Sequence, residues 1–102
     1  MYMYNIIIMF RFEYNLEKDT ILKKTRGVGF EEIIDTINDN KVLEDIKNPS
    51  FKRYPNQRIF ILEIKGYAFV VPYVVDKKRK VNFLKTYWPS RKYTKKYFKL
   101  IK

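Results

Sequence analysis

The chain has 102 residues, 46% of them hydrophobic, and it carries a formal net charge of +11. This length and composition indicate one folded domain with a modest core and exclude a disordered tail. Cysteine and histidine are both absent, which excludes disulfides, thiolate metal sites, and the zinc and triad hydrolases that depend on histidine.

The positive charge is concentrated in the second half of the chain. Residues 1–51 contain seven Lys or Arg against nine Asp or Glu, whereas residues 52–102 contain fifteen against two. This asymmetry favours a polyanion or an acidic partner, although a lysine-rich surface also serves solubility alone. The apolar run 6–10 is much shorter than the roughly 20 residues of a membrane-spanning helix. We therefore expect a cytoplasmic protein that does not enter the membrane.

The N-terminal region predicts a strand followed by a helix. Residues 6–14 are rich in β-branched and aromatic residues and alternate apolar with charged from Phe10 onwards, which predicts a strand with one wet face. Met9 opens this segment, so residues 1–8 are interpreted as an N-terminal extension or as the product of an upstream start codon. Asn15 predicts the N-cap of a helix that continues to about residue 25 and stops at Gly27.

A second helix has the clearer amphipathic pattern. Its apolar residues follow the helical spacing i, i+3, i+4, i+7 and are Phe30, Ile33, Ile34 and Ile37. Its acidic residues occupy other faces and are Glu31, Glu32, Asp35 and Asp39. We interpret these acids as an ordinary solvated face near a helix N-terminus rather than as metal ligands or acid–base groups. The sequence therefore predicts neither a metal site nor a cofactor.

The second half predicts an antiparallel meander and a final helix. Residues 41–46 fit a short strand or an extended connection, and a polar loop follows up to residue 56. Strands are predicted at Arg58–Ile64, Tyr67–Val75 and Val81–Tyr87, with a tight hairpin at Lys65-Gly66 and a bulge or sheet edge at Pro72. Ser90 predicts the N-cap of a helix with one apolar stripe, formed by Tyr93, Tyr97, Leu100 and Ile101. The expected fold is α+β, with an N-terminal strand, two helices on one face, the three-stranded meander and a C-terminal helix.

Basic residues alternate with aromatic ones in three groups of this second half. They are Lys52–Arg58, Lys77–Lys80 and Lys85–Lys92, and we expect the first two to share one end of the sheet with the third at the opposite end. Lys and Arg neutralise phosphates while aromatic rings stack on unpaired bases, so RNA is the predicted ligand. The candidate contacts are Lys52, Arg53, Tyr54, Arg58 and Lys92. Tyr93 and Tyr97 fit the core better, whereas Tyr87 and Trp88 fit the core and a stacking role equally well.

RNA cleavage is chemically accessible without histidine, because the 2′-OH of the RNA is the nucleophile. The protein then has to stabilise the phosphorane and move two protons. Arg91 and Lys85 are the candidates for stabilising the phosphate charge, with Lys92 as a weaker third. Tyr87 or Tyr54 could move a proton in a cationic environment that lowers its pKa.

Both ends of the chain resemble BrnT-like toxins. The resemblance is carried by Phe12-Glu13-Tyr14-Asn15-Leu16-Glu17-Lys18, by Arg26-Gly27-Val28-Gly29-Phe30-Glu31-Glu32 at the family spacing, and by Pro89-Ser90-Arg91-Lys92-Tyr93-Thr94. By position, Lys18 matches a family lysine, which adds it to the RNA-binding candidates, and Arg91 matches the arginine of the C-terminal motif. Arg26 stands where the family has His, Leu22 where it often has Asn, and Pro89 where it has Ser.

The resemblance implies a RelE/ParE-like fold and a ribonuclease toxin of a type II toxin–antitoxin system that arrests translation. It also implies RNA, free or on the ribosome, as the substrate, and a DNA-binding antitoxin of the ribbon-helix-helix type as the partner. Two alternatives stay open on the residues alone. One is a non-catalytic nucleic-acid-binding regulator, and the other is an interaction protein whose basic face receives an acidic partner.

Overall fold

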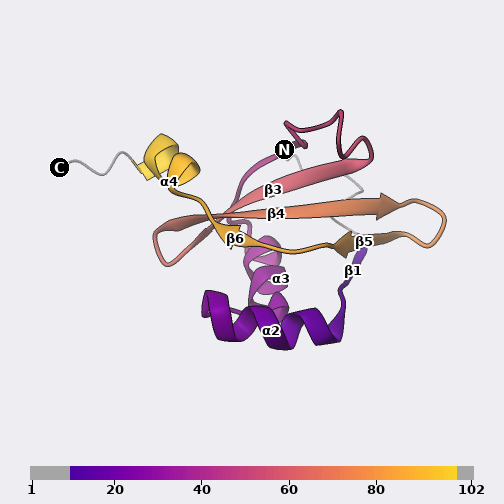
Figure 1. Cartoon of the computed structure of the whole chain (residues 1–102), viewed down its shortest axis with the longest axis horizontal. Helices are drawn as coiled ribbons and strands as arrows, with labels where there is room; N and C mark the ends of the chain where they lie inside the picture. The colour runs from indigo at the N-terminus through magenta and orange to yellow at the C-terminus, as the bar shows by residue number, and fades with distance from the viewer. Residues whose placement is uncertain (1–9, 99–102) are drawn as a thin grey trace.

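The computed structural model describes residues 10–98, which form one sheet with helices on both faces (Figure 1). In chain order the elements are β1 (Arg11–Glu13), α2 (Leu16–Arg26), α3 (Phe30–Asn38), β2 (Val42–Lys47), β3 (Gln57–Ile64), β4 (Tyr67–Asp76), β5 (Val81–Leu84), β6 (Trp88–Pro89) and α4 (Arg91–Phe98). The predicted N-terminal extension, the start of the first predicted strand and the end of the last predicted helix lie outside the described residues.

The sheet has the order β1-β5-β4-β3-β2, with β6 pairing β4 beyond the end of β5. The pair β1–β5 is parallel and the other pairs are antiparallel. The α+β class and the meander β3–β4–β5 are confirmed, and the segment after residue 41 is a strand rather than a connection. No helix within residues 10–98 is long and apolar enough to cross a membrane.

The two N-terminal helices are joined by one buried carboxylate. Asn15 caps α2, since its Oδ1 accepts from the Lys18 N–H at 2.9 Å, and Gly27 ends the helix in the left-handed conformation. Asp19 on α2 then supplies the cap that Gly29 cannot give α3, because its Oδ1 accepts from the Phe30 N–H at 2.8 Å. A Cβ at Gly29 would lie 3.2 Å from that same carboxylate oxygen and 2.5 Å from the Lys23 side chain. A glycine there lets the two helices meet.

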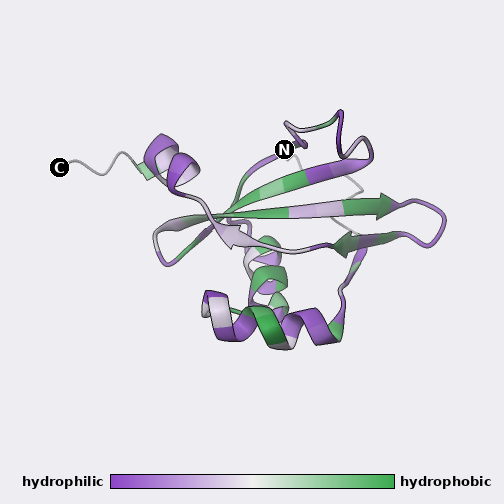
Figure 2. Ribbon diagram, viewed as in Figure 1, coloured by the Kyte–Doolittle hydropathy of each residue, from purple (hydrophilic) through white to green (hydrophobic). Residues whose placement is uncertain are grey.

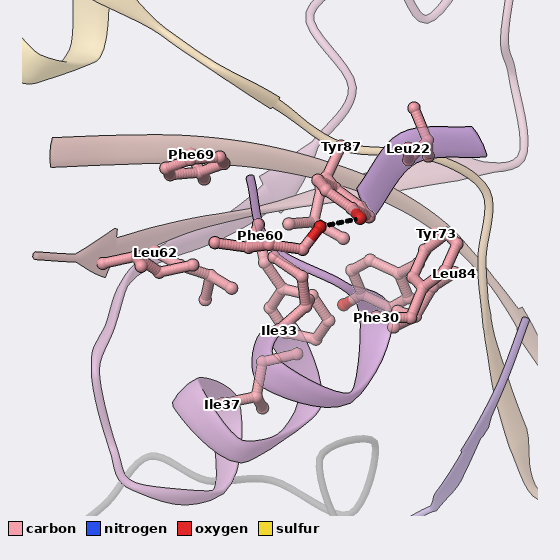
Figure 3. Close-up of a cluster of buried hydrophobic side chains, with 13 residues drawn as sticks. Leu22, Phe30, Ile33, Ile37, Phe60, Leu62, Phe69, Tyr73, Leu84 and Tyr87 are labelled. Atoms are coloured by element: carbon pink, nitrogen blue, oxygen red, sulfur yellow. Dashed lines mark hydrogen bonds between the residues drawn. The ribbon is translucent and has the colours of Figure 1, made fainter. Parts of the chain in front are cut away.

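The main core lies between these helices and the sheet (Figure 3). Phe60 stacks on Tyr73 with ring centres 4.1 Å apart, and Phe30 contacts Tyr87 edge-on at 4.9 Å. Such aromatic pairs contribute beyond the area they bury. The face covered by α2 and α3 is therefore filled with packed side chains.

The opposite face carries a smaller core under α4. Tyr93, Tyr97 and Phe98 pack against a cluster of β3 and β4 residues, namely Ile59, Ile61, Ala68 and Val70. This confirms the packing role predicted for Tyr93 and Tyr97. Ser90 caps α4, as predicted, by accepting from the Tyr93 N–H at 3.1 Å. The backbone of Ala68 is held on both sides, because its N–H donates to Thr94 Oγ1 at 2.9 Å and its C=O accepts from Ser90 at 2.8 Å. These bonds fix the start of α4 on the sheet.

The predicted strand Val81–Tyr87 is wrong at its C-terminal end. β5 ends at Leu84, and pairing with β4 resumes only at Trp88. Pro72 explains the interruption, because its C=O accepts from the Lys85 N–H at 2.9 Å but its ring nitrogen has no hydrogen to donate in return. Tyr73 pairs with Leu84 and Val70 pairs with Trp88, so three residues of the partner segment lie opposite Val71 and Pro72. The bulge predicted at Pro72 therefore forms, but on the neighbouring segment rather than in β4 itself.

Candidate nucleic-acid interface

A groove opens between the loop 48–56 and the start of α4, which lie on the same side of the sheet (Figure 1). Its volume is about 310 Å³, and Ile59 and Val70 are its lining residues from β3 and β4. The remaining lining residues are Asn48, Pro49, Ser50 and Tyr54 from the loop, and Trp88, Ser90, Lys92 and Tyr93 at α4. We call this the loop–helix groove.

The loop wall is held by its own hydrogen bonds. Asn48 and Gln57 bond through both backbone and side chain, at 3.0 and 3.1 Å. Inside that closure, Asn48 Oδ1 accepts from the Ser50 N–H at 2.8 Å, and the Tyr54 N–H donates to the Ser50 carbonyl at 2.9 Å. These bonds fix the backbone position of Tyr54 in the loop.

Aromatic rings and cations alternate around this groove. Tyr54 is 40% exposed and Trp88 38% exposed, although both are large rings that proteins usually bury. The Arg53 guanidinium lies 5.5 Å from the centre of the Tyr54 ring, and the Lys92 ammonium lies 5.3 Å from that of Tyr93. Rings that accept a stacked base and cations that neutralise its phosphate are the two components of single-stranded nucleic-acid binding.

The sequence left open whether Trp88 is a core residue or a residue available for stacking. Backbone pairing places it on the groove side of the sheet. Trp88 pairs with Val70 of β4, a residue of the face that carries α4, and both residues line the groove. Its position beside a proline at a strand–helix junction was the signal in the sequence. Pairing of β6 with β4 holds the ring on a rigid element rather than on a free loop.

Three other predicted site residues, two RNA contacts and one catalytic residue, lie on the same loop and helix as the lining residues but do not line the groove. Lys52 and Arg53 are exposed on the loop, and Arg91 is exposed at the first position of α4, next to Lys92. Within residues 10–98, no hydrogen bond or ion pair engages the Arg91 guanidinium. Figure 2 shows α4 and the loops as mainly hydrophilic, with the hydrophobic residues concentrated in the strands and on α3.

Two further predicted residues come together elsewhere. Lys18 on α2 and Lys85 after β5 line a second groove of about 480 Å³, together with Asn15, Glu17, Ile21 and Phe83. The Lys85 ammonium lies 5.3 Å from the centre of the Phe83 ring. We call this the edge groove. The sequence did not predict Phe83 as a groove residue. Its place in the alternating pattern of β5 indicates only a half-buried residue of a strand.

Tyr87 is a core residue and not a proton carrier. Its side chain is fully buried and its hydroxyl donates to the Val28 carbonyl (Figure 3). Its own carbonyl accepts from Arg26 Nε at 3.2 Å. Burial, reinforced by the charge of Asp19, raises the pKa of the hydroxyl to about 12. This corrects the catalytic role expected for Tyr87, since a group with no solvent access cannot exchange a proton with RNA.

Arg58 is partly exposed, and its guanidinium is engaged by groups of the sheet. Its Nε donates to Asp45 Oδ1 at 3.1 Å and its Nη2 to the Asp45 carbonyl at 2.9 Å. The buried Tyr73 hydroxyl donates to the same carboxylate, and burial together with that hydrogen bond raises the pKa of Tyr73. The cluster joins β2, β3 and β4 and gives Arg58 a structural role, and Arg58 does not line the loop–helix groove. Its RNA-binding role stays a prediction.

The expected grouping of basic segments also changes. The register places Gln57 opposite Val74 near the Lys77–Lys80 turn, as predicted, but the loop before it folds back towards α4. The turn is held separately, with Arg79 bonded to Glu13 at 2.8 Å.

Residues 10–98 contain no group of three or more Asp or Glu side chains that could hold a metal ion.

Comparison with known proteins gives no match for this chain, whether among protein-family models, curated proteins or solved structures.

Proposed function

We propose that this protein binds RNA through the loop–helix groove. The observation that carries the proposal is the convergence of Tyr54, Trp88 and Lys92 on one groove. Two exposed rings suit an unpaired base, and Lys92 with the nearby Arg53 and Arg91 suits the adjoining phosphates. The surplus of thirteen positive charges after residue 51 favours a polyanion as the ligand.

We further propose that the protein is a toxin of a type II toxin–antitoxin system. It would cleave RNA without a metal ion and thereby inhibit translation. Two observations support it. A strand, two helices, a meander and a final helix follow one another in the order predicted from the sequence, with β2 and β6 in addition. Arg91 is exposed beside the groove and, within residues 10–98, unpaired, so it is available to stabilise a phosphorane. Tyr54 remains as the tyrosine that could move a proton.

The same proposal implies a protein partner. A DNA-binding antitoxin, expected to be of the ribbon-helix-helix type and encoded nearby, would neutralise the toxin. Expression of this chain alone would then arrest growth, and coexpression with the neighbouring gene would restore it.

A non-catalytic RNA-binding regulator is the second candidate, and one observation favours it. The three predicted catalytic residues are not gathered, because Lys85 lines the edge groove, Arg91 begins α4 and Tyr87 is buried. Cleavage would require Lys92 and Arg91 to supply the phosphate stabilisation without Lys85.

RNA binding is tested with the fluorescence of Trp88, the only tryptophan of the chain. A base stacked on its ring quenches the emission. Tyr54→Ala should weaken binding by about 1–3 kcal/mol, which corresponds to one lost stacking contact. Tyr67→Ala is the matched control, because Tyr67 is an exposed tyrosine at the start of β4 that does not line the loop–helix groove. Unquenched fluorescence with every RNA would refute the proposed function.

Cleavage is tested separately on the same preparation. Wild-type protein and Arg91→Ala are incubated with total RNA in EDTA, and the products are resolved on a gel. Fragments from the wild type alone support the ribonuclease. Quenching of Trp88 with intact RNA in both samples identifies the regulator instead.

A further inference from the structure

The loop–helix groove and the edge groove share a continuous stretch of backbone. Lys85 lines the edge groove, and Trp88, Ser90 and Lys92 line the loop–helix groove. Between them lie only Thr86 and Tyr87, and the Tyr87 side chain points into the core. The backbone from Lys85 to Trp88 spans roughly 10 Å when extended.

This connecting segment is fixed along its length. The Lys85 N–H donates to Pro72 at 2.9 Å, Trp88 pairs with Val70, and the Ser90 N–H donates to Ala68 at 2.8 Å. All three contacts are with β4, the central strand of the meander. The spacing of the two grooves is therefore built into the sheet.

Both grooves offer the same pair of chemical groups. In the edge groove, the Lys85 ammonium lies over the Phe83 ring, and Lys18 faces the same space from α2. In the loop–helix groove, Lys92 accompanies Tyr54 and Trp88. Glu17 is the only acidic residue that lines either groove as described, so a chain of phosphates meets cations at both ends.

We infer that the two grooves form one track for a single RNA strand. This inference rests on the proposed function. A base stacks in the loop–helix groove, the strand crosses the segment Lys85–Trp88, and its next phosphates lie between Lys18 and Lys85. Phosphates along one strand are at least about 3.4 Å apart, so the crossing takes no more than about three nucleotides. A dinucleotide fills the loop–helix groove alone, whereas a longer strand reaches both.

The test compares two RNA lengths against matched variants. The dinucleotide UpU and decauridylate are titrated into wild type, Lys18→Ala/Lys85→Ala and the control Lys24→Ala/Lys41→Ala, with Trp88 quenching as the readout. The control removes the same charge from two exposed lysines that line neither groove. Thermal unfolding of each variant checks that the fold is retained.

The inference predicts a loss that depends on length. Lys18→Ala/Lys85→Ala should weaken decauridylate binding about tenfold, and the slope of log K against log salt should fall by about 1.4, for two lost phosphate contacts of a single strand. UpU binding should stay unchanged in the same variant. The control should change neither ligand by more than about twofold.

Other results would overturn the track while leaving RNA binding intact. Decauridylate affinity and salt slope equal to wild type in Lys18→Ala/Lys85→Ala would place the edge groove outside the RNA site. An equal loss of decauridylate affinity in the control would show that the effect comes from the lower net charge and not from the edge groove. Binding of polyglutamate that only Lys18→Ala/Lys85→Ala abolishes, with decauridylate unaffected, would assign the edge groove to an acidic protein. Quenching by neither RNA refutes the proposed function itself.

Discussion

The two faces of the sheet carry similar aromatic side chains in opposite surroundings. On the face covered by α2 and α3, Phe60, Tyr73 and Tyr87 are fully buried and packed ring against ring. On the face that carries α4, Tyr54 and Trp88 remain exposed beside cations. Aromatic content alone therefore does not distinguish the structural face from the face that carries the groove. The direction of each side chain from the sheet decides which rings stabilise the fold and which remain available to a ligand.

The largest expected effect is on the covered face. Phe60→Ala removes a buried ring that stacks on Tyr73, and it should lower the free energy of unfolding by about 3–5 kcal/mol. Phe51→Ala, which truncates an exposed ring on the loop, should change it by less than about 0.5 kcal/mol. Denaturant unfolding measures both. Similar losses in the two variants would break the distinction between the faces.

Alkaline pH probes the same face through Tyr87. Its pKa rises from the ordinary 10.0 to about 12, so the folded state holds this proton more tightly than the unfolded state. The resulting stabilisation is complete below pH 10 and is lost as pH rises to about 12, by at most about 3 kcal/mol. Tyr87→Phe should flatten this decline in unfolding free energy measured between pH 9 and pH 12. A decline of unchanged steepness would contradict the assignment.

Arg58→Gln separates structural from ligand-binding cations. It removes the ion pair with Asp45 and should cost about 1–2 kcal/mol of unfolding free energy. RNA affinity should stay within about twofold of wild type, because Arg58 does not line the loop–helix groove. Fluorescence titration and denaturant unfolding on one preparation give both values. A large loss of RNA affinity with intact stability would place Arg58 in the binding site.

Lys92→Ala should show the reverse pattern with the smallest energy. Unfolding free energy should stay the same, because Lys92 is exposed and its contact among residues 10–98 is with the Tyr93 ring. RNA affinity should fall several-fold, and the salt slope should fall by about 0.7 for one phosphate contact. A salt titration of wild type and variant measures this. An unchanged slope would remove Lys92 from the phosphate contacts.

Local signals in the sequence predicted most of the elements. Asn15 and Gly27 set the ends of α2 through hydrogen bonds within a few residues of themselves. The hairpin at Lys65-Gly66 formed as expected, with both residues at positive φ, as a tight turn of this kind requires. Such features depend on neighbours in the chain, so a single sequence contains them.

The site depended on contacts between distant residues, which the sequence alone does not show. Arg58 finds Asp45 only after β2 and β3 have paired. Tyr87 and Trp88 are adjacent, yet one faces the core and the other the groove. The register that separates them follows the interruption opposite Pro72 on another strand. The backward fold of the loop 48–56, which brings Tyr54 to the groove, had no local signal at all.

The interruption opposite Pro72 has a consequence for solubility at high concentration. Beyond Phe83, β1 no longer covers β5, so the stretch from Lys85 to Pro89 forms the outer margin of the described sheet. A straight strand there would offer its unpaired backbone groups to another molecule and seed edge-to-edge aggregation. The irregular stretch that Pro72 imposes, with a second proline at Pro89, cannot template such a pairing. Replacing Pro72 would regularise this margin and, with it, invite self-association.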